Sequence, residues 1–187
     1  LYLAAAGIGT LGIIDNDKVS LSNLQRQIIH DTDHLDAAKT QSAAATIARL
    51  NPDVKVELHE ERLTAQNALE IISRYDIVAD GCDNFATRFL VSDACYLARR
   101  PLVSAAVGPF EGQLATFKPY EKDEEGTPLP TYRCLVPEAP APGSIPTCES
   151  AGVLGALTGV MGSLQALEVI KEITGAGESL TGKLLIY

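Results

Sequence analysis

The chain has no tryptophan, only four cysteines, and no run of about 18 apolar residues that could cross a membrane. Its start, Leu1 to Gly7, lacks the basic residues of a signal peptide. The cysteines form no C-x-x-C pair and no disulfide-dense pattern, so we expect a reducing, cytoplasmic compartment. Basic residues are also few, with 15 Lys and Arg against 24 Asp and Glu. The resulting net charge of −9 argues against a general nucleic-acid or membrane binder.

Aromatic residues make up only 5% of the 187 residues, so Ala, Val, Ile and Leu must carry the core. Short apolar runs alternate with helical patterns along the chain. We predict strands within 9–14, 54–59, 75–84, 101–107, 112–117 and 182–187, and helices within 33–50, 65–74, 85–99 and 151–174. This order predicts an α/β fold with a mostly parallel sheet flanked by helices, and additional strands in the C-terminal half.

We expect residues 1–187 to form a single domain that is incomplete at both ends, with an irregular crossover over about 119–150. Its beginning contains the pattern G-x-G-x-x-G, from Gly7 to Gly12. The phosphate-binding version of this pattern follows a strand and opens a helix. Here the pattern follows a helical segment and enters a strand, so we interpret Gly7 as a helix cap. A true glycine loop and its strand would then lie upstream of Leu1.

A polar stretch follows the first predicted strand, where Asp15 begins the sequence D-N-D-K-V-S-L-S-N-L-Q-R. In open α/β sheets, ligands bind at the carboxyl ends of strands, and an acid there can bind ribose hydroxyls. Asp15 fits that role. Asn23 and Arg26 offer an amide and a guanidinium, and the latter matches phosphate geometry. A solvated turn with a helix cap is the alternative that this stretch leaves open.

Two further polar residues stand at similar positions. Lys39 lies near the beginning of a predicted helix, where its charge opposes the helix dipole unless an anion is held there. Asp83 and Asn84 follow another buried strand. We expect the two acidic strand ends, Asp15 and Asp83, to face one crevice. A solvated lysine is the alternative for Lys39.

Several strings along the chain together resemble a known family. They are D-N-D from Asp15, S-N-L-Q-R-Q from Ser22, Lys39, Asp83-Asn84 with Arg88, F-E-G-Q from Phe110, Y-R-C from Tyr132, T-C-E-S-A-G-V-L-G from Thr147, and G-S-L-Q-A from Gly162. In this order they resemble the MoeB/ThiF/ubiquitin-activating superfamily, and most of all the bacterial MoeB, ThiF and HesA-like adenylyltransferases. The resemblance spans nearly the whole chain and implies a Rossmann-like fold.

The resemblance also implies a reaction. An enzyme of this kind uses ATP to adenylate the C-terminal glycine of a ubiquitin-like sulfur-carrier protein of the MoaD or ThiS type, for molybdopterin or thiamine biosynthesis. It implies that Asp15 binds the ribose, that Asn23, Arg26 and Lys39 bind phosphates, and that Asp83, beside Asn84, binds Mg²⁺ or the reacting phosphate. A crevice with cations and a metal-binding acid suits such a transfer. The family also implies a homodimer.

The chain departs from the family pattern in three respects. The glycine loop and the arginine that family dimers donate across the interface would both lie upstream of Leu1. The first zinc-binding C-x-x-C pair is T-Y-R-C, ending at Cys134, and the second would lie beyond Tyr187, so we expect no zinc. Cys148 matches a position that attacks the adenylate or carries sulfur in some members, and a structural thiol is the alternative. Cys82 and Cys95 resemble buried fillers.

Two other functions remain open from the sequence. One is a dinucleotide-binding oxidoreductase, against which the misplaced glycine pattern and the pair Arg26 and Lys39 both argue. The other is a non-catalytic partner, like the inactive halves of ubiquitin-like activating heterodimers. The presence of Asp15, Arg26, Lys39 and Asp83 argues against such decay.

Overall fold

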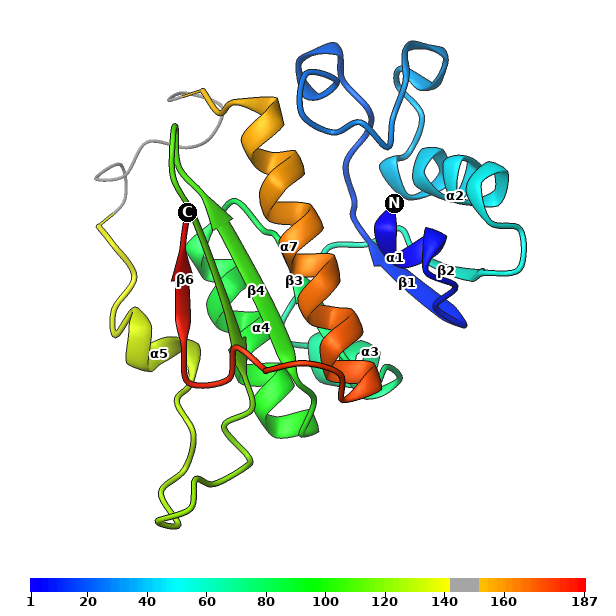
Figure 1. The fold of residues 1–187 in the computed structure, drawn as a ribbon. Coiled ribbons are helices and arrows are strands. Elements are labelled where there is room, and N and C mark those ends of the chain that lie inside the picture. Colours follow the sequence, from blue (N-terminus) through cyan, green and yellow to red (C-terminus); the bar gives the residue numbers. More distant parts are fainter. Residues whose placement is uncertain (142–151) are drawn as a thin grey trace. The chain divides into compact units, whose positions relative to one another are not determined.

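The structure is a computed structural model that describes residues 1–141 and 152–187. Its contacts divide the chain into two compact units, Leu1–Leu63 and Thr64–Tyr187 (Figure 1). Both units combine helices with parallel strand pairs, so the predicted α/β fold class is confirmed. The single domain over 1–187 stays a prediction. No helix within the described ranges is both long and apolar enough to span a bilayer.

The first unit is built on a two-stranded parallel sheet. Strand β1 (Thr10–Ile14) pairs with β2 (Lys55–His59), with Thr10 opposite Lys55 and Ile14 opposite His59. The short helix α1 (Tyr2–Ala5) precedes β1, and Gly7 (φ +81°) takes the left-handed conformation just after its end, as the sequence predicts. Helix α2 (Lys39–Leu50) precedes β2. The core is small: Ala4, Ile47 and Val54 form a buried cluster, with Leu11, Ile13, Ile29 and Val56 packed against them, and Val19 and Ala43 are also buried.

The long segment between β1 and α2 is folded rather than extended. It contains two 3₁₀ turns, Leu21–Asn23 and Thr32–His34. The helix predicted from residue 33 begins only at Lys39, so that prediction was wrong by six residues. The physical reason is that Asp36 has a left-handed φ of 64°, and Val19 pairs with the backbone of Asp36 and Ala37. Residues 36 and 37 are therefore hydrogen-bonded to Val19 immediately before the helix begins.

The second unit contains a four-stranded sheet in the order β3-β4-β5-β6. Its strands are β3 (Val78–Asp80), β4 (Leu102–Val107), β5 (Gly112–Phe117) and β6 (Leu184–Ile186). Strands β3 and β4 are parallel because helix α4 (Phe85–Ala98) makes the crossover between them. The additional strands expected in the C-terminal half are present, and both are antiparallel. The carboxyl ends of β3 and β4 therefore lie at the same edge as the beginning of β5.

Helices α4 and α7 (Gly155–Thr174) cover opposite faces of this sheet (Figure 1). Two short helices, α3 (Ala68–Ser73) and α5 (Tyr132–Leu135), complete the unit. Within the helical segment predicted over 151–174, helix α7 begins at Gly155 and ends at Thr174. Helix α7 packs so closely on β5 that a Cβ on Gly112 would lie 2.4 Å from Sδ of Met161. The lack of a side chain at Gly112 in the F-E-G-Q string therefore leaves the space that Met161 of α7 occupies.

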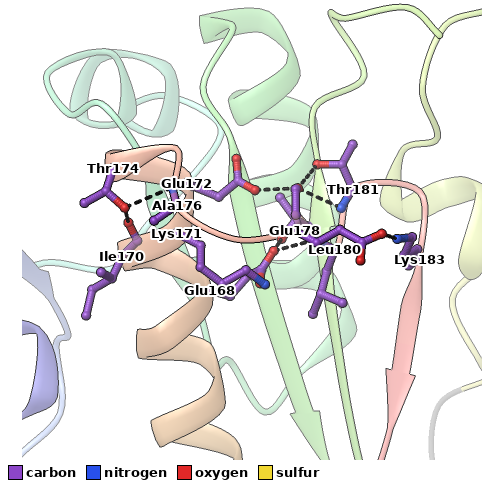
Figure 2. A network of polar contacts seen from close by, with 12 residues as sticks. Glu168, Ile170, Lys171, Glu172, Thr174, Ala176, Glu178, Leu180, Thr181 and Lys183 are labelled. Atoms are coloured by element: carbon purple, nitrogen blue, oxygen red, sulfur yellow. Dashed lines mark hydrogen bonds and ion pairs between the residues drawn. The ribbon is translucent and has the colours of Figure 1, made fainter. Parts of the chain in front are cut away.

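The far end of α7 carries a buried glutamate. Glu168 is 1% exposed, and its Oε1 accepts hydrogen bonds from Oγ1 of Thr116 (2.9 Å) and from the N–H of Leu180 (2.6 Å). Its other oxygen accepts from Lys171 (Figure 2). One turn later, Glu172 binds Nζ of Lys118 (2.6 Å). This network joins α7, β5 and the segment before β6 at the sheet edge opposite Asp83.

Candidate functional site

In the first unit, two acids and one lysine meet at the carboxyl end of β1. Asp15 directly follows the strand, and its N–H donates to the carbonyl of His59 at the end of β2. Nζ of Lys39 lies 2.9 Å from Oδ2 of Asp17 and 3.8 Å from Oδ2 of Asp15. Oδ1 of Asp15 accepts from the N–H of Asp17 (2.8 Å). Asp15, Asp17 and Lys39 therefore form a charged cluster at this strand end, and its role in nucleotide binding stays a prediction.

Lys39 is the first residue of α2 and is only 9% exposed. A buried cation at a helix N-terminus is doubly unfavourable, because burial and the helix dipole both oppose its charge. The structure offsets both with Asp17, whose carboxylate binds Nζ and whose carbonyl accepts from the N–H of Lys39 (3.0 Å). An anion was expected near Lys39 from the sequence, but Asp17 was not predicted to supply it. The alternative of a solvated lysine was wrong.

Asn23 and Arg26 lie in the same unit, in the first turn of the segment between β1 and α2. The carbonyl of Asn23 accepts from the N–H groups of Arg26 (3.1 Å) and Gln27 (2.9 Å), which closes the turn. Nη1 of Arg26 donates to the carbonyl of Ser22 (3.2 Å), and the residue is half-buried. These bonds hold the S-N-L-Q-R string in one turn.

His30 follows this turn, and no role for it was predicted from the sequence. Its Nδ1 lies 2.9 Å from Oγ of Ser42 on α2. Burial lowers the pKa of His30, the positive charge of Lys39 lowers it further, and Asp15 and Asp31 act in the opposite direction. The imidazole therefore lies within electrostatic range of the Lys39 cluster and is neutral at pH 7.

In the second unit, Asp83 and Asn84 lie between β3 and α4. Asn84 is the N-cap of α4, and its Oδ1 accepts from the N–H of Thr87 (2.9 Å). Its side-chain amide lies 3.4 Å from Oδ1 of Asp83. Asp83 is exposed. Because Asp15 belongs to the first unit and Asp83 to the second, their shared crevice stays a prediction.

A buried charge pair lies at the carboxyl end of β3, three residues before Asp83. This pair was not predicted from the sequence. Asp80, the last residue of β3, is 3% exposed, and Arg88 on α4 is 8% exposed. Nη1 of Arg88 donates to Oδ2 of Asp80 (3.2 Å) and to Oγ of Ser104 (3.1 Å). The resemblance included Arg88 without assigning a contact. The available signal was an arginine among apolar residues, eight positions after an acid at a strand end.

The cysteines differ in environment. Burial, followed by the charge of Asp80, raises the pKa of Cys82 and raises that of Cys95 to about 12, so both thiols stay protonated. Cys134 is exposed. Cys148 lies outside the described residues. Within the described ranges, no group of three or more His, Cys, Asp or Glu side chains is placed to hold a metal ion.

The chain matches the model of the ThiF family over residues 1–187. It is 48% identical to MoeZ of Mycobacterium tuberculosis over 187 residues, and 46% identical to the sulfur carrier protein adenylyltransferase of Thermus thermophilus over 186. It is 49% identical to the adenylyltransferase and sulfurtransferase MOCS3 of Bos taurus. The alignments include the whole of this chain but 47%, 68% and 39% of those proteins. The chain thus spans about half the length of MoeZ.

Solved structures support the same fold. A crystal structure of E. coli MccB with MccA-N7isoASN superposes with a TM-score of 0.79 at 21% identity, covering 98% of this chain and 55% of that one. A crystal structure of E. coli MccB with ATP gives a TM-score of 0.75 at 19% identity, covering 96% and 54%. At these identities the likeness concerns the fold, which is the Rossmann-like arrangement that the sequence predicts.

Proposed function

Because this chain belongs to the ThiF family, we propose that it forms the nucleotide-binding part of an enzyme that adenylates the C-terminal glycine of a ubiquitin-like sulfur carrier. The observation that carries this proposal is the buried Lys39 beside Asp15 and Asp17 at the carboxyl end of β1. Strand ends of this kind are where α/β folds bind nucleotides. The ammonium group of a lysine at this position can donate charge-assisted hydrogen bonds to the oxygens of a polyphosphate.

In the proposed reaction, a carboxylate oxygen of the carrier's terminal glycine attacks the α-phosphorus of ATP. A new oxygen–phosphorus bond forms, the bond to the oxygen that bridges the α- and β-phosphates breaks, and pyrophosphate leaves with that electron pair. No proton needs to move in this step. The protein therefore contributes positioning and charge neutralisation rather than acid–base chemistry.

The proposed roles follow from the donor and acceptor groups of the site. Asp15 accepts hydrogen bonds from the ribose hydroxyls, while Asn23, Arg26 and Lys39 donate to phosphate oxygens. Lys39 exchanges its contact with Asp17 for one with a phosphate.

Asp83 is an exposed carboxylate next to the side-chain amide of Asn84. That donor set fits Mg²⁺ held jointly with substrate phosphates, which commonly uses only one or two protein carboxylates. Bound there, Mg²⁺ would neutralise charge on the phosphates. We also propose that the full-length protein is a homodimer.

The test is carrier-dependent ATP–pyrophosphate exchange by the full-length protein, with Lys39→Met as the variant. Removing one preorganised charge from a transition state typically costs about 10²–10³-fold in rate, and we expect a loss of this size. Lys55→Met is the matched control, because Lys55 is also paired with an acid in the first unit (2.6 Å to Glu57) but is exposed on β2. It should keep wild-type exchange.

Two results would contradict the proposal. Exchange by a folded Lys39→Met protein within about threefold of wild type would remove the lysine from the site. Calorimetric titration that finds binding of NAD and none of ATP with Mg²⁺ would favour the oxidoreductase alternative.

A further inference from the structure

The turn before Asp83 is held by the buried pair Asp80 and Arg88. Oδ1 of Asp80 accepts from the N–H of Cys82 (2.9 Å), and Nη2 of Arg88 donates to the carbonyl of Cys82. Both main-chain polar groups of Cys82 are therefore bound by the same charge pair. The carbonyl of Cys82 belongs to the peptide group that continues into Asp83, so its direction is fixed immediately before the acid.

The other side of Asp83 is fixed independently. Asn84 caps α4 through the N–H of Thr87, and α4 is the helix that carries Arg88. Nη2 of Arg88 also donates to the carbonyl of Ala105 (2.8 Å), which ties the guanidinium to β4. Asp83 is thus an exposed residue whose two neighbours, Cys82 and Asn84, are each held by hydrogen bonds.

The protein does not need this charge pair merely to fill its core. Replacing a buried ion pair by apolar side chains of similar volume is often neutral or stabilising, because the charges no longer have to be desolvated. A guanidinium can do what an apolar side chain cannot, because it donates in several directions at once to carbonyl and carboxylate oxygens. The presence of a buried arginine at position 88 is therefore explained by the main-chain groups that its guanidinium binds.

We propose that Arg88, neutralised by Asp80, is a positioning residue that orients Asp83 for the adenylation step by holding the main chain of Cys82. This inference rests on the proposed function, in which Asp83 acts on Mg²⁺ or the reacting phosphate. Arg88 itself is buried beneath the turn and touches no substrate.

Gln165 on α7 provides the matched control. Its Nε2 donates to the carbonyls of Asp80 (2.9 Å), the last residue of β3, and Val103 (2.9 Å), near the beginning of β4, so it joins the same two strands from the opposite face. Among the described residues, Gln165 forms no hydrogen bond with Cys82, Asp83 or Asn84. Gln165→Leu should lower the melting temperature while leaving exchange kinetics near wild type.

The experiment separates folding from positioning by removing both charges together. Arg88→Met alone leaves a buried unpaired carboxylate and should lower the melting temperature strongly. The double variant Asp80→Leu with Arg88→Met removes that carboxylate and should recover most of the loss, yet both holds on Cys82 stay absent. In carrier-dependent exchange by the full-length double variant, we expect kcat to fall about 10²-fold and the Mg²⁺ concentration for half-maximal rate to rise, with little change in KM for ATP.

Each outcome decides something. A folded double variant with wild-type kcat and Mg²⁺ dependence would overturn the positioning role, because stability would then be all that the pair supplies. If the double variant does not fold, Arg88→Lys is measured instead: its single ammonium cannot reach all four partners, so kcat should still fall, and an unchanged kcat would overturn the inference. Absence of exchange in the wild-type protein would overturn the proposed function instead.

Discussion

Glu168 allows a quantitative test of how the second unit is held together. Three donors share its carboxylate: Thr116, the N–H of Leu180 and Lys171. Replacing Glu168 by leucine removes every acceptor and leaves Thr116, which is 1% exposed, without its partner. The ammonium of Lys171 retains access to water, since its side chain is 21% exposed.

The expected loss can be estimated from these contacts. An unsatisfied buried hydroxyl costs roughly 1–3 kcal/mol, the half-buried N–H of Leu180 about 1 kcal/mol, and the lost charge-assisted bond about 1.5–3 kcal/mol. Burying a leucine side chain returns about 1.5–3 kcal/mol. The free energy of unfolding should therefore fall by about 2–4 kcal/mol, which is a large part of the stability of a typical domain.

Urea denaturation followed by far-UV circular dichroism measures this loss. With a slope of about 2 kcal/mol per molar urea, the midpoint of the affected transition should fall by about 1–2 M. Glu178→Leu is the control, because Glu178 also pairs with a lysine, Lys183, but its side chain is 82% exposed (Figure 2). Its midpoint should not change. Equal midpoints for wild type and Glu168→Leu would refute the reasoning.

The same residue predicts a pH dependence. Burial alone would raise the pKa of Glu168, but hydrogen bonds from Lys171, Leu180 and Thr116 more than offset it and hold the pKa below its ordinary value of 4.5. A lowered folded-state pKa means that the ionised group contributes stability above the unfolded-state pKa and loses it as pH falls through the folded-state pKa. As the pH falls below 4.5, wild type should therefore lose more stability than Glu168→Gln.

Two further predictions concern helix packing and the thiol outside the described residues. Gly112→Ala should destabilise the second unit by about 1–3 kcal/mol in the same urea assay, because the new Cβ would collide with Met161. Gly159→Ala, where a Cβ meets open space, should not, and equal losses would exclude the collision as the cause. Cys148→Ala should keep ATP–pyrophosphate exchange but lose sulfur transfer to the carrier, because the carrier supplies the nucleophile in the first reaction and only the second needs a thiol of the enzyme. Loss of both activities in a folded protein would indicate a structural thiol, and loss of neither an idle one.

The sequence predicted the elements well where the pattern was local. Strand β5 (Gly112–Phe117) was predicted with its observed bounds, and α4 to within one residue, because alternation, helical spacing and the Asn84 cap all lie in neighbouring residues. The beginning of α2 was missed because it depends on pairing between Val19 and residues 36–37, which local propensity does not contain. The antiparallel direction of β5 and β6 was likewise not available from periodicity.

The same distinction applies to the site. Asp15, Lys39 and Asp83 could be selected from the sequence because they stand at strand or helix ends. The residues that contact and support such groups could not be predicted from the sequence. Asp17 lies 22 residues before Lys39, Ser104 lies 16 after Arg88, and Thr116 lies 52 before Glu168. Such partners are brought together only by the tertiary fold, and burial then decides which charges need them.

The small core of the first unit has a consequence for how substrate and fold are linked. A two-stranded sheet depends on helix packing for its stability, and here that packing involves few fully buried side chains. Regions with so few buried contacts open most readily in the native state, and their amide hydrogens exchange earliest.

Asp15 and Lys39 lie in this unit. A ligand that binds this unit only when it is fully folded, and not when it is locally opened, increases its local stability. The increase is about 2.7 kcal/mol at a ligand concentration one hundred times the Kd. ATP would then act as a structural component of the first unit as well as a reactant. Amide exchange in β1 and α2 would slow as the nucleotide concentration rises, and would recover when the nucleotide is consumed.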